Sequence, residues 1–273
     1  MIRKAAHAGS FYPRFAQQIE RQISGWIQGV QPSKGYEDTL GIIVPHAGYI
    51  YSGQCAALAY QDISQHNFDS FIILHPCHQG NHFDYSVSAF EEYETPLGNI
   101  MLDLQLYETL SGAARDKNLE LRLHESEHSM EIQLPLIKHF FPNARICPVM
   151  FGRQTPEVAQ RLAMSIYEIL KNSQRRIGII VSTDLSHYHN SEKAAKLDKL
   201  ITKYIMSFDP DALWQSVISG RCEACGIGGI ITLLDLAKRY EDAKSKLIQY
   251  THSGKSSGDN LQVVGYLSAK IFR

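Results

Sequence analysis

The sequence lacks the features that would place it among membrane, nucleic-acid-binding or disulfide-stabilised proteins. No stretch of about 18 apolar residues is present, so we expect no membrane span. The 27 Lys and Arg residues are balanced by 28 Asp and Glu residues, and this formal net charge of −1 gives no reason to expect nucleic acid or an anionic membrane as a partner. The five cysteines are an odd number scattered over 273 residues, which predicts a reducing, cytoplasmic location rather than a disulfide framework.

Two familiar cofactor motifs are also missing. Cys222 and Cys225 form one Cys-x-x-Cys pair, but no second pair exists with which they could build a structural zinc site. The glycine run at 226–229 lacks the spacing of a dinucleotide or phosphate loop, so nucleotide binding is not expected. The first 18 residues contain charges and Pro13 but no apolar core, so we do not expect a signal peptide.

Three short apolar runs, at 41–44, 71–74 and 177–181, set the pattern of the chain. Continuous Ile/Val/Leu runs of this length are typical of strands buried on both faces of a parallel sheet. Helical patterns are expected at 16–30, 54–63, 103–114, 127–140 (kinked or divided by Pro135), 156–170, 211–219 and 226–240. Further strands are expected at 85–90, 146–151 and 261–272, with a loop at 252–260. The pattern predicts a single α/β domain over residues 1–273, in which a central, mostly parallel or mixed β-sheet has helices on both faces.

Each apolar run opens at once into a polar turn. His46 follows the first run, His78 follows the second, and Asp184 and His187 follow the third. Ligands of open α/β sheets collect at the carboxyl ends of the strands, so these side chains are expected to face one crevice. Imidazole is the commonest protein ligand for transition metals. Either histidine alone is better explained as a turn cap or a partner of a backbone carbonyl, but their matching positions make a metal site an equally good explanation of the pair.

Two further groups have both a functional and a structural interpretation. Asp184 beside His187 could fix the imidazole tautomer for a general base or a metal site, or it could cap a following helix. His128 and Glu131 share one helical face beside Glu127, as metal or acid–base sites often require, yet acidic residues also suit the positive end of any helix.

Cys225 stands directly before a run of glycines, where the thiol is uncrowded. A helix N-terminus at this point would lower the pKa of the thiol. The residue is therefore the most suggestive cysteine of the chain, and one hypothesis makes it the nucleophile of a cysteine hydrolase or transferase with His46 or His187 as its base. Cys55, Cys77 and Cys147 are interpreted as buried, inert thiols.

Taken together, these motifs resemble those of the Memo family, also called AmmeMemoRadiSam system protein B, almost from end to end. The resemblance rests on His7-Ala8-Gly9-Ser10, Pro45-His46-Ala47-Gly48-Tyr49, Pro76-Cys77-His78, Glu127-His128-Ser129-Met130-Glu131, Ser182-Thr183-Asp184-Leu185-Ser186-His187 and Cys225-Gly226. It implies the architecture of class III extradiol dioxygenases, which hold non-haem Fe(II) with two histidines and a glutamate. In the Memo pattern a cysteine replaces the carboxylate, so His46, His78 and Cys225 would be the metal ligands.

The resemblance also implies roles for the surrounding residues. Asp184 and His187 would be the catalytic groups beside the metal, and the pocket would be formed by His7, Tyr49, Glu127, His128 and Glu131. The implied function is that of a cytoplasmic, redox-active protein containing iron or copper. The alternative is a non-enzymatic module that binds a peptide or small-molecule ligand and has lost dioxygenase chemistry. Microbial family members are encoded beside a radical enzyme, which implies a functional link to such a partner.

This chain departs from the family pattern at two places near the expected pocket. Gln79 stands where members often have a second histidine, and Ile227-Gly228 stands where they can carry Arg-His. Both departures remove polar groups, so the ligand preference of the pocket is expected to differ from that of other members.

Overall fold

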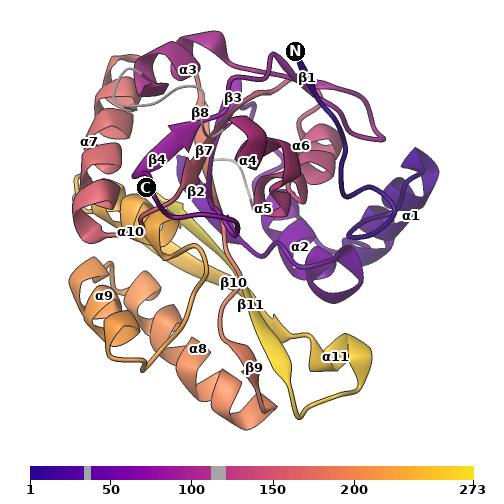
Figure 1. Ribbon diagram of the computed structural model, residues 1–273, viewed down its shortest axis with the longest axis vertical. Coiled ribbons are helices and arrows are strands. Elements are labelled where there is room, and N and C mark those ends of the chain that lie inside the picture. Colours follow the sequence, from indigo (N-terminus) through magenta and orange to yellow (C-terminus); the bar gives the residue numbers. More distant parts are fainter. Residues whose placement is uncertain (34–37, 112–120) are drawn as a thin grey trace.

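A mixed β-sheet forms the centre of the molecule, with helices packed on both of its faces (Figure 1). The computed structural model describes residues 1–33, 38–111 and 121–273. The strands of the main sheet are β2 (Thr39–Val44), β3 (Ser70–Pro76), β4 (Tyr85–Val87), β7 (Arg145–Phe151), β8 (Ile177–Ser182), β9 (His187–His189), β10 (Lys244–His252) and β11 (Val263–Phe272). Within the described residues, seven of these strands follow the order β10-β11-β2-β8-β3-β7-β4, and β9 pairs with β11.

The four inner strands β2, β8, β3 and β7 run parallel to one another. β11 pairs antiparallel with β2 on one side, and β4 pairs antiparallel with β7 on the other. The predicted parallel or mixed sheet is therefore confirmed, and all three apolar runs lie in its parallel part. A small second sheet contains β1 (Ile2–Arg3), β5 (Glu92–Tyr93) and β6 (Ile100–Met101).

Alternate side chains of the inner strands enter two separate hydrophobic cores. Ile43, Leu74 and Val181 belong to one core, whereas their neighbours Ile42 and Ile73 belong to the other. The helices are α1 (Ala16–Trp26), α2 (Gln54–Asp62), α3 (Leu104–Ser111), α4 (Leu121–Ser126), α5 (His128–Glu131), α6 (Leu134–Phe140), α7 (Pro156–Asn172), α8 (Ser191–Met206), α9 (Pro210–Ile218), α10 (Ile227–Ala237) and α11 (Gly254–Ser257), with a π-helix η1 (Tyr49–Gly53) before α2. Helices α3, α7, α8, α9 and α10 cover the first core, and α1, α2 and α6 cover the second. Burial on both faces explains why these strands lack polar alternation.

Local sequence signals account for several helix boundaries. The Thr155 side chain accepts a hydrogen bond from the Val158 N–H and caps α7, as its position before a proline predicts. The helix predicted at 127–140 is divided into α5 and α6, and Pro135 lies in the first turn of α6, where its missing N–H leaves no hydrogen bond unmade. The helix predicted at 103–114 is α3, and residues 112–114 lie outside the described residues.

The last third of the chain differs from the sequence-based interpretation in three places. Asp184 caps no helix, because the chain continues into β9, and Asn190 provides the cap of α8. The predicted loop at 252–260 begins with the last residue of β10 and contains α11. Neither α8 nor β10 was expected, because α8 is rich in lysine and β10 is a half-exposed edge strand, so both have weak apolar patterns. Among the described residues, no helix combines the length and apolar character needed to cross a membrane.

Candidate metal centre

The register of the sheet brings three predicted site residues to one edge. β2 and β8 end level with each other, because Val44 pairs with Ser182. β3 lies on the other side of β8 and runs parallel to it. His46 stands two residues beyond the end of β2, Asp184 two residues beyond the end of β8, and His78 two residues beyond the end of β3. This equal spacing beyond neighbouring parallel strands explains why residues so distant in sequence meet.

Cys225 is added to this edge by the start of α10. The Cys225 N–H donates to the Asp184 carbonyl at 3.1 Å, and the Gly226 N–H donates to the Thr183 Oγ1 at 2.9 Å. A Cβ on Gly226 would lie 2.6 Å from the Ser182 carbonyl oxygen, so only glycine allows the helix to begin this close to β8. The glycine thus fixes the distance between the thiol and the strand end.

The three predicted metal ligands come together. One ligand atom from each of His46, His78 and Cys225 lies within 4.8 Å of the other two. The His46 Nε2 and the Cys225 Sγ are 3.2 Å apart, and the two histidine rings are almost perpendicular, with centroids 5.3 Å apart. Donors that surround one ion at about 2.0–2.3 Å are themselves roughly 3–4 Å apart. The two imidazoles and the thiol therefore fit a transition metal.

Hydrogen bonds assign the tautomer of His46. The Ser182 hydroxyl donates to the Ser129 carbonyl at 2.6 Å, so its oxygen must accept from the His46 Nδ1–H, which lies 3.0 Å away. The Gln133 amide also donates to this hydroxyl oxygen, at 3.0 Å. The proton is thereby held on Nδ1, and the lone pair of Nε2 points toward Cys225.

A buried carboxylate does the same for His78. The Glu127 Oε1 lies 2.8 Å from the His78 Nδ1, and the Glu127 Oε2 accepts the His78 backbone N–H at 2.8 Å. Burial alone would raise the pKa of Glu127, but the hydrogen bond and charge of His78 outweigh it and hold that pKa well below its usual range. For His78 the directions are reversed. Burial alone would lower its pKa, but the hydrogen bond and charge of Glu127 outweigh burial, and the pKa of His78 is raised. The carboxylate orients the ring and leaves Nε2 available to a metal.

The pKa of the Cys225 thiol is raised, not lowered as its place before a helix predicts. Burial is the main cause, and the nearby Asp184 carboxylate adds to it. The Asp184 N–H donates to the Cys225 sulfur at 3.1 Å, but this bond does not compensate for the burial. Burial also raises the pKa of Asp184 to about 7, against the opposing effect of hydrogen bonds from the backbone N–H groups of His46 and Ala47. A bound cation would reverse this preference for neutral groups and favour the thiolate.

His187, the second predicted catalytic residue, begins β9. Its ring is half-buried, and its backbone N–H donates to the Glu223 Oε2 at 3.2 Å. Burial lowers the pKa of His187, and the charge of His78 acts in the same direction. The ring is consequently neutral at pH 7 and can accept a proton.

Two of the predicted pocket residues form a wall of rings with Phe11, which sequence reasoning did not single out. The centroid of the Phe11 ring lies 5.1 Å from the centroid of the His7 ring and 4.9 Å from that of the His128 ring. The His128 ring continues the wall to the metal centre, because its centroid is 4.5 Å from His78 and 5.4 Å from His46.

Two other predicted pocket residues have partners away from the donor atoms. Glu131 is buried and forms an ion pair with the equally buried Arg3. Its Oε1 also accepts from the Tyr12 hydroxyl at 2.7 Å and the His7 N–H at 2.8 Å, so it joins the N-terminal segment to α5. The Tyr49 ring lies in the second core beside the rings of Tyr12 and Trp26, and its hydroxyl donates to the Ile132 carbonyl at 3.0 Å. Glu131 and Tyr49 thus support the pocket from behind.

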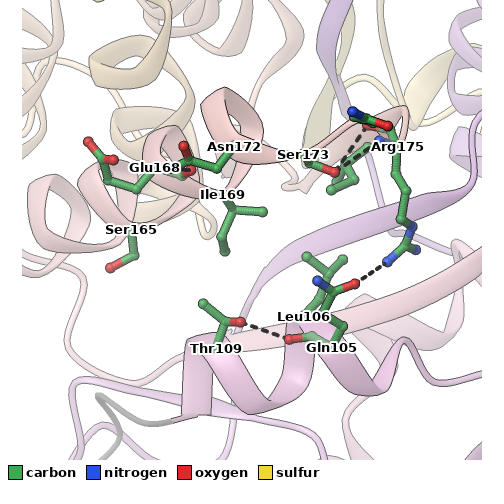
Figure 2. Close-up of a pocket in the computed structure, with 11 residues that line it drawn as sticks. Gln105, Leu106, Thr109, Ser165, Glu168, Ile169, Asn172, Ser173 and Arg175 are labelled. Carbon is green, nitrogen blue, oxygen red and sulfur yellow. Dashed lines mark hydrogen bonds between the residues drawn. The ribbon is translucent and has the colours of Figure 1, made fainter.

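A separate pocket of about 620 Å³ lies between α3 and α7 (Figure 2). Leu106 and Ile169 face each other across it, and polar side chains such as Thr109 and Ser165 surround them. Ile177, the first residue of β8, also lines this pocket, so it lies at the opposite end of that strand from Asp184. The histidines and the cysteine are not part of it, and its lining suggests no chemistry.

The chain is similar to known proteins over most of its length. A sequence model of the family described as Memo-like protein matches residues 3–270. A MEMO1 family protein from Methanobrevibacter smithii is 34% identical and aligns over 100% of both chains. One from Sulfurisphaera tokodaii is 36% identical over 99% of both chains. An uncharacterized Escherichia coli K12 protein, JW3007, has a similar fold, with a TM-score of 0.50 at 10% identity, over 84% of this chain and 98% of its own. The chain therefore belongs to the Memo family.

Proposed function

We propose that this chain is a redox-active metal protein that binds iron or copper through His46, His78 and Cys225. The observation that carries the proposal is the 3.2 Å approach of the Cys225 Sγ to the His46 Nε2, with the Nδ1 atoms of both histidines engaged elsewhere. Imidazole suits many ions, whereas a thiolate selects copper(I), zinc or iron over magnesium and calcium. The Cys225 thiol therefore gives the centre its preference for a soft metal.

The residues beside the centre suit proton transfer in a pocket similar to that of class III extradiol dioxygenases. A bound metal would supply a Lewis acid and a site for electron transfer. Asp184, whose pKa is raised to about 7 by burial, can hold or release a proton near neutral pH. His187, whose pKa burial lowers, is a neutral base at that pH. We assign proton transfer to these two side chains, whose pKa values are shifted in opposite directions from their ordinary values.

A second candidate function is ligand binding without turnover. The ring wall of His7, Phe11 and His128 offers a surface on which a planar group of a small molecule or peptide could stack. A cysteine hydrolase is less well supported, because the raised pKa of the Cys225 thiol keeps it protonated and weakly nucleophilic.

Metal analysis tests the first proposal. The untagged protein would be purified anaerobically and examined by elemental analysis and absorption spectroscopy. We expect about one equivalent of iron or copper per chain, with a thiolate-to-metal absorption band that disappears in Cys225→Ser. Absence of both metals, or an unchanged spectrum in Cys225→Ser, would rule out the proposed centre. Ligand binding by metal-free protein would then favour the second candidate.

A further inference from the structure

A second set of possible metal donors adjoins the first. Single ligand atoms of His78, Glu127 and His128 also lie within 4.8 Å of one another. The Glu127 Oε1 is 2.8 Å from the His78 Nδ1 and 3.2 Å from the His128 Nδ1. These separations are close to the roughly 3–4 Å between donors around one ion. The His78 nitrogen in this set is Nδ1, the one that contacts Glu127.

His128 has no other polar partner that accounts for its position. Within the described parts of the chain, no hydrogen bond to either ring nitrogen of His128 is found; the contact with Glu127 is close enough for an ion pair but lacks hydrogen-bond geometry. The ring is held instead by packing, between Phe11 on one side and His78 on the other. Packing therefore presents a bare imidazole nitrogen beside a buried carboxylate.

We propose that the His78 Nδ1, a Glu127 carboxylate oxygen and the His128 Nδ1 form a second metal position, and that the His78 imidazole bridges it to the Cys225 centre. Two nitrogens and one oxygen suit a borderline divalent cation such as Zn²⁺ or Co²⁺ better than a soft monovalent ion. Binding replaces the Nδ1 proton of His78 with the cation, and this proton is released to solvent. No electron is transferred in the step.

Exposure of the donors favours entry of a cation from the pocket. The side chains of His78 and His128 are 35% and 24% exposed, whereas that of Glu127 is 1% exposed. The rival interpretation is that Glu127 only orients His78, as carboxylates beside metal-binding histidines commonly do. In that case the Glu127 oxygen that bonds His78, which also accepts the Ser129 N–H at 3.1 Å, has no capacity left for a metal. The two interpretations differ in the number of ions bound.

Cobalt(II) titration of the metal-free, full-length protein under argon counts the ions and distinguishes the two positions. The Cys225 centre gives a thiolate-to-cobalt charge-transfer band in the near ultraviolet, and the second position gives only ligand-field bands. We expect wild type to bind two equivalents, Cys225→Ser one equivalent without the charge-transfer band, and His128→Gln one equivalent with it. His189→Gln is the matched control, because His189 also contacts a carboxylate, Glu223, at 2.8 Å but belongs to no three-donor group among the described residues, and it should bind two equivalents.

These outcomes distinguish this inference from the proposed function. The second metal position can exist without the Cys225 centre, and only the bridge rests on the proposed function. Saturation of wild type at one equivalent, or two equivalents in His128→Gln, would overturn the second position. Two equivalents in Cys225→Ser with one in His128→Gln would support the second position and overturn the Cys225 centre. Circular dichroism checks that each variant is folded, and His128→Ala repeats the measurement without a polar side chain.

Electron paramagnetic resonance then tests whether His78 bridges the two metal positions. Two bridged cobalt(II) ions should give a signal smaller than the sum of the signals of the singly loaded variants, and additive signals would contradict the bridge.

Discussion

The sulfur of Cys225 lies 3.2 Å from the Nε2 of His46, although 179 residues separate them in the sequence. The contact joins the turn after β2 to the segment that leads into α10. It depends on glycine at position 226, whose missing side chain lets α10 begin against the end of β8. The donor set is therefore fixed by the fold and does not rely on a flexible loop.

Replacement Cys225→Ser should weaken copper(I) binding by about tenfold or more, on the order of 1.4 kcal/mol, because a poorly ionised hydroxyl replaces the soft donor. Competition with a copper(I) chelator measures the change. Cys222→Ser is the matched control: Cys222 is buried in the core, and burial raises its pKa to about 11, so its loss should lower stability but leave copper affinity unchanged. Equal losses of affinity in both variants would indicate a two-cysteine site, and no loss in Cys225→Ser would eliminate the proposed ligand.

Replacement Ser182→Ala should lower metal affinity by about 10–100-fold, the usual effect of removing a group that orients a metal-binding histidine. Without this hydroxyl the His46 Nδ1–H has no acceptor, and the tautomer with a free Nε2 loses its preference. Isothermal titration with Zn²⁺ provides the measurement. Ser216→Ala removes an equally buried hydroxyl in α9 and should leave the affinity unchanged. A similar affinity in all three proteins would show that Ser182 does not position the ring.

Replacement Glu131→Gln should destabilise the protein by about 3–5 kcal/mol, because it leaves the buried guanidinium of Arg3 without its counter-charge. Urea unfolding measures this loss. Arg153→Ala breaks an exposed ion pair with Asp84 and should cost about 1 kcal/mol or less. Because Glu131 is engaged by Arg3 and Tyr12, metal stoichiometry should not change in either variant. Loss of the metal together with retained stability would instead make Glu131 a ligand.

Sequence patterns predicted the sheet and the strand-end histidines for one physical reason. Strands buried on both faces must be apolar throughout, so their ends are sharp, and His46 and His78 each stand two residues beyond such an end. Cys225 has no such local signal: its choice over Cys222 as a metal ligand rested on the family resemblance, and only the packing of α10 against β8 explains its position.

The groups that support the centre could not be predicted, because they depend on contacts between distant segments. Ser182 and Gln133 are 49 residues apart, as are His78 and Glu127. Serine after a strand or glutamine in a helix is ordinary by itself. The raised pKa of Cys225 was missed for the same reason, since the helix N-terminus is visible in the sequence but burial beside Asp184 is not.

The pH dependence of stability gives a test of the buried Asp184 carboxyl in the metal-free protein. Burial raises its pKa from the ordinary 3.8 to about 7, so between these values the folded chain binds a proton that the unfolded chain has lost. Its contribution to stability is fully present below pH 3.8 and is lost as pH rises through 7, by up to about 1.4 kcal/mol per pH unit. The amide introduced by Asp184→Asn would not titrate, so the free energy of unfolding of this variant relative to wild type should increase from pH 5 to 7 and then level off.

Urea unfolding at pH 5, 6, 7 and 8 in the presence of a chelator measures this difference. Asp84→Asn is a control with the opposite sign: burial tends to raise the pKa of Asp84, but hydrogen bonds from Arg153 and Arg161 outweigh it and lower the pKa. Asp84 is therefore ionised in both the folded and unfolded chains throughout this range, and the difference between Asp84→Asn and wild type should not vary with pH. A constant or decreasing difference for Asp184→Asn would show that the carboxyl is ionised in the folded protein at pH 5, and that it does not hold a proton for transfer near neutral pH.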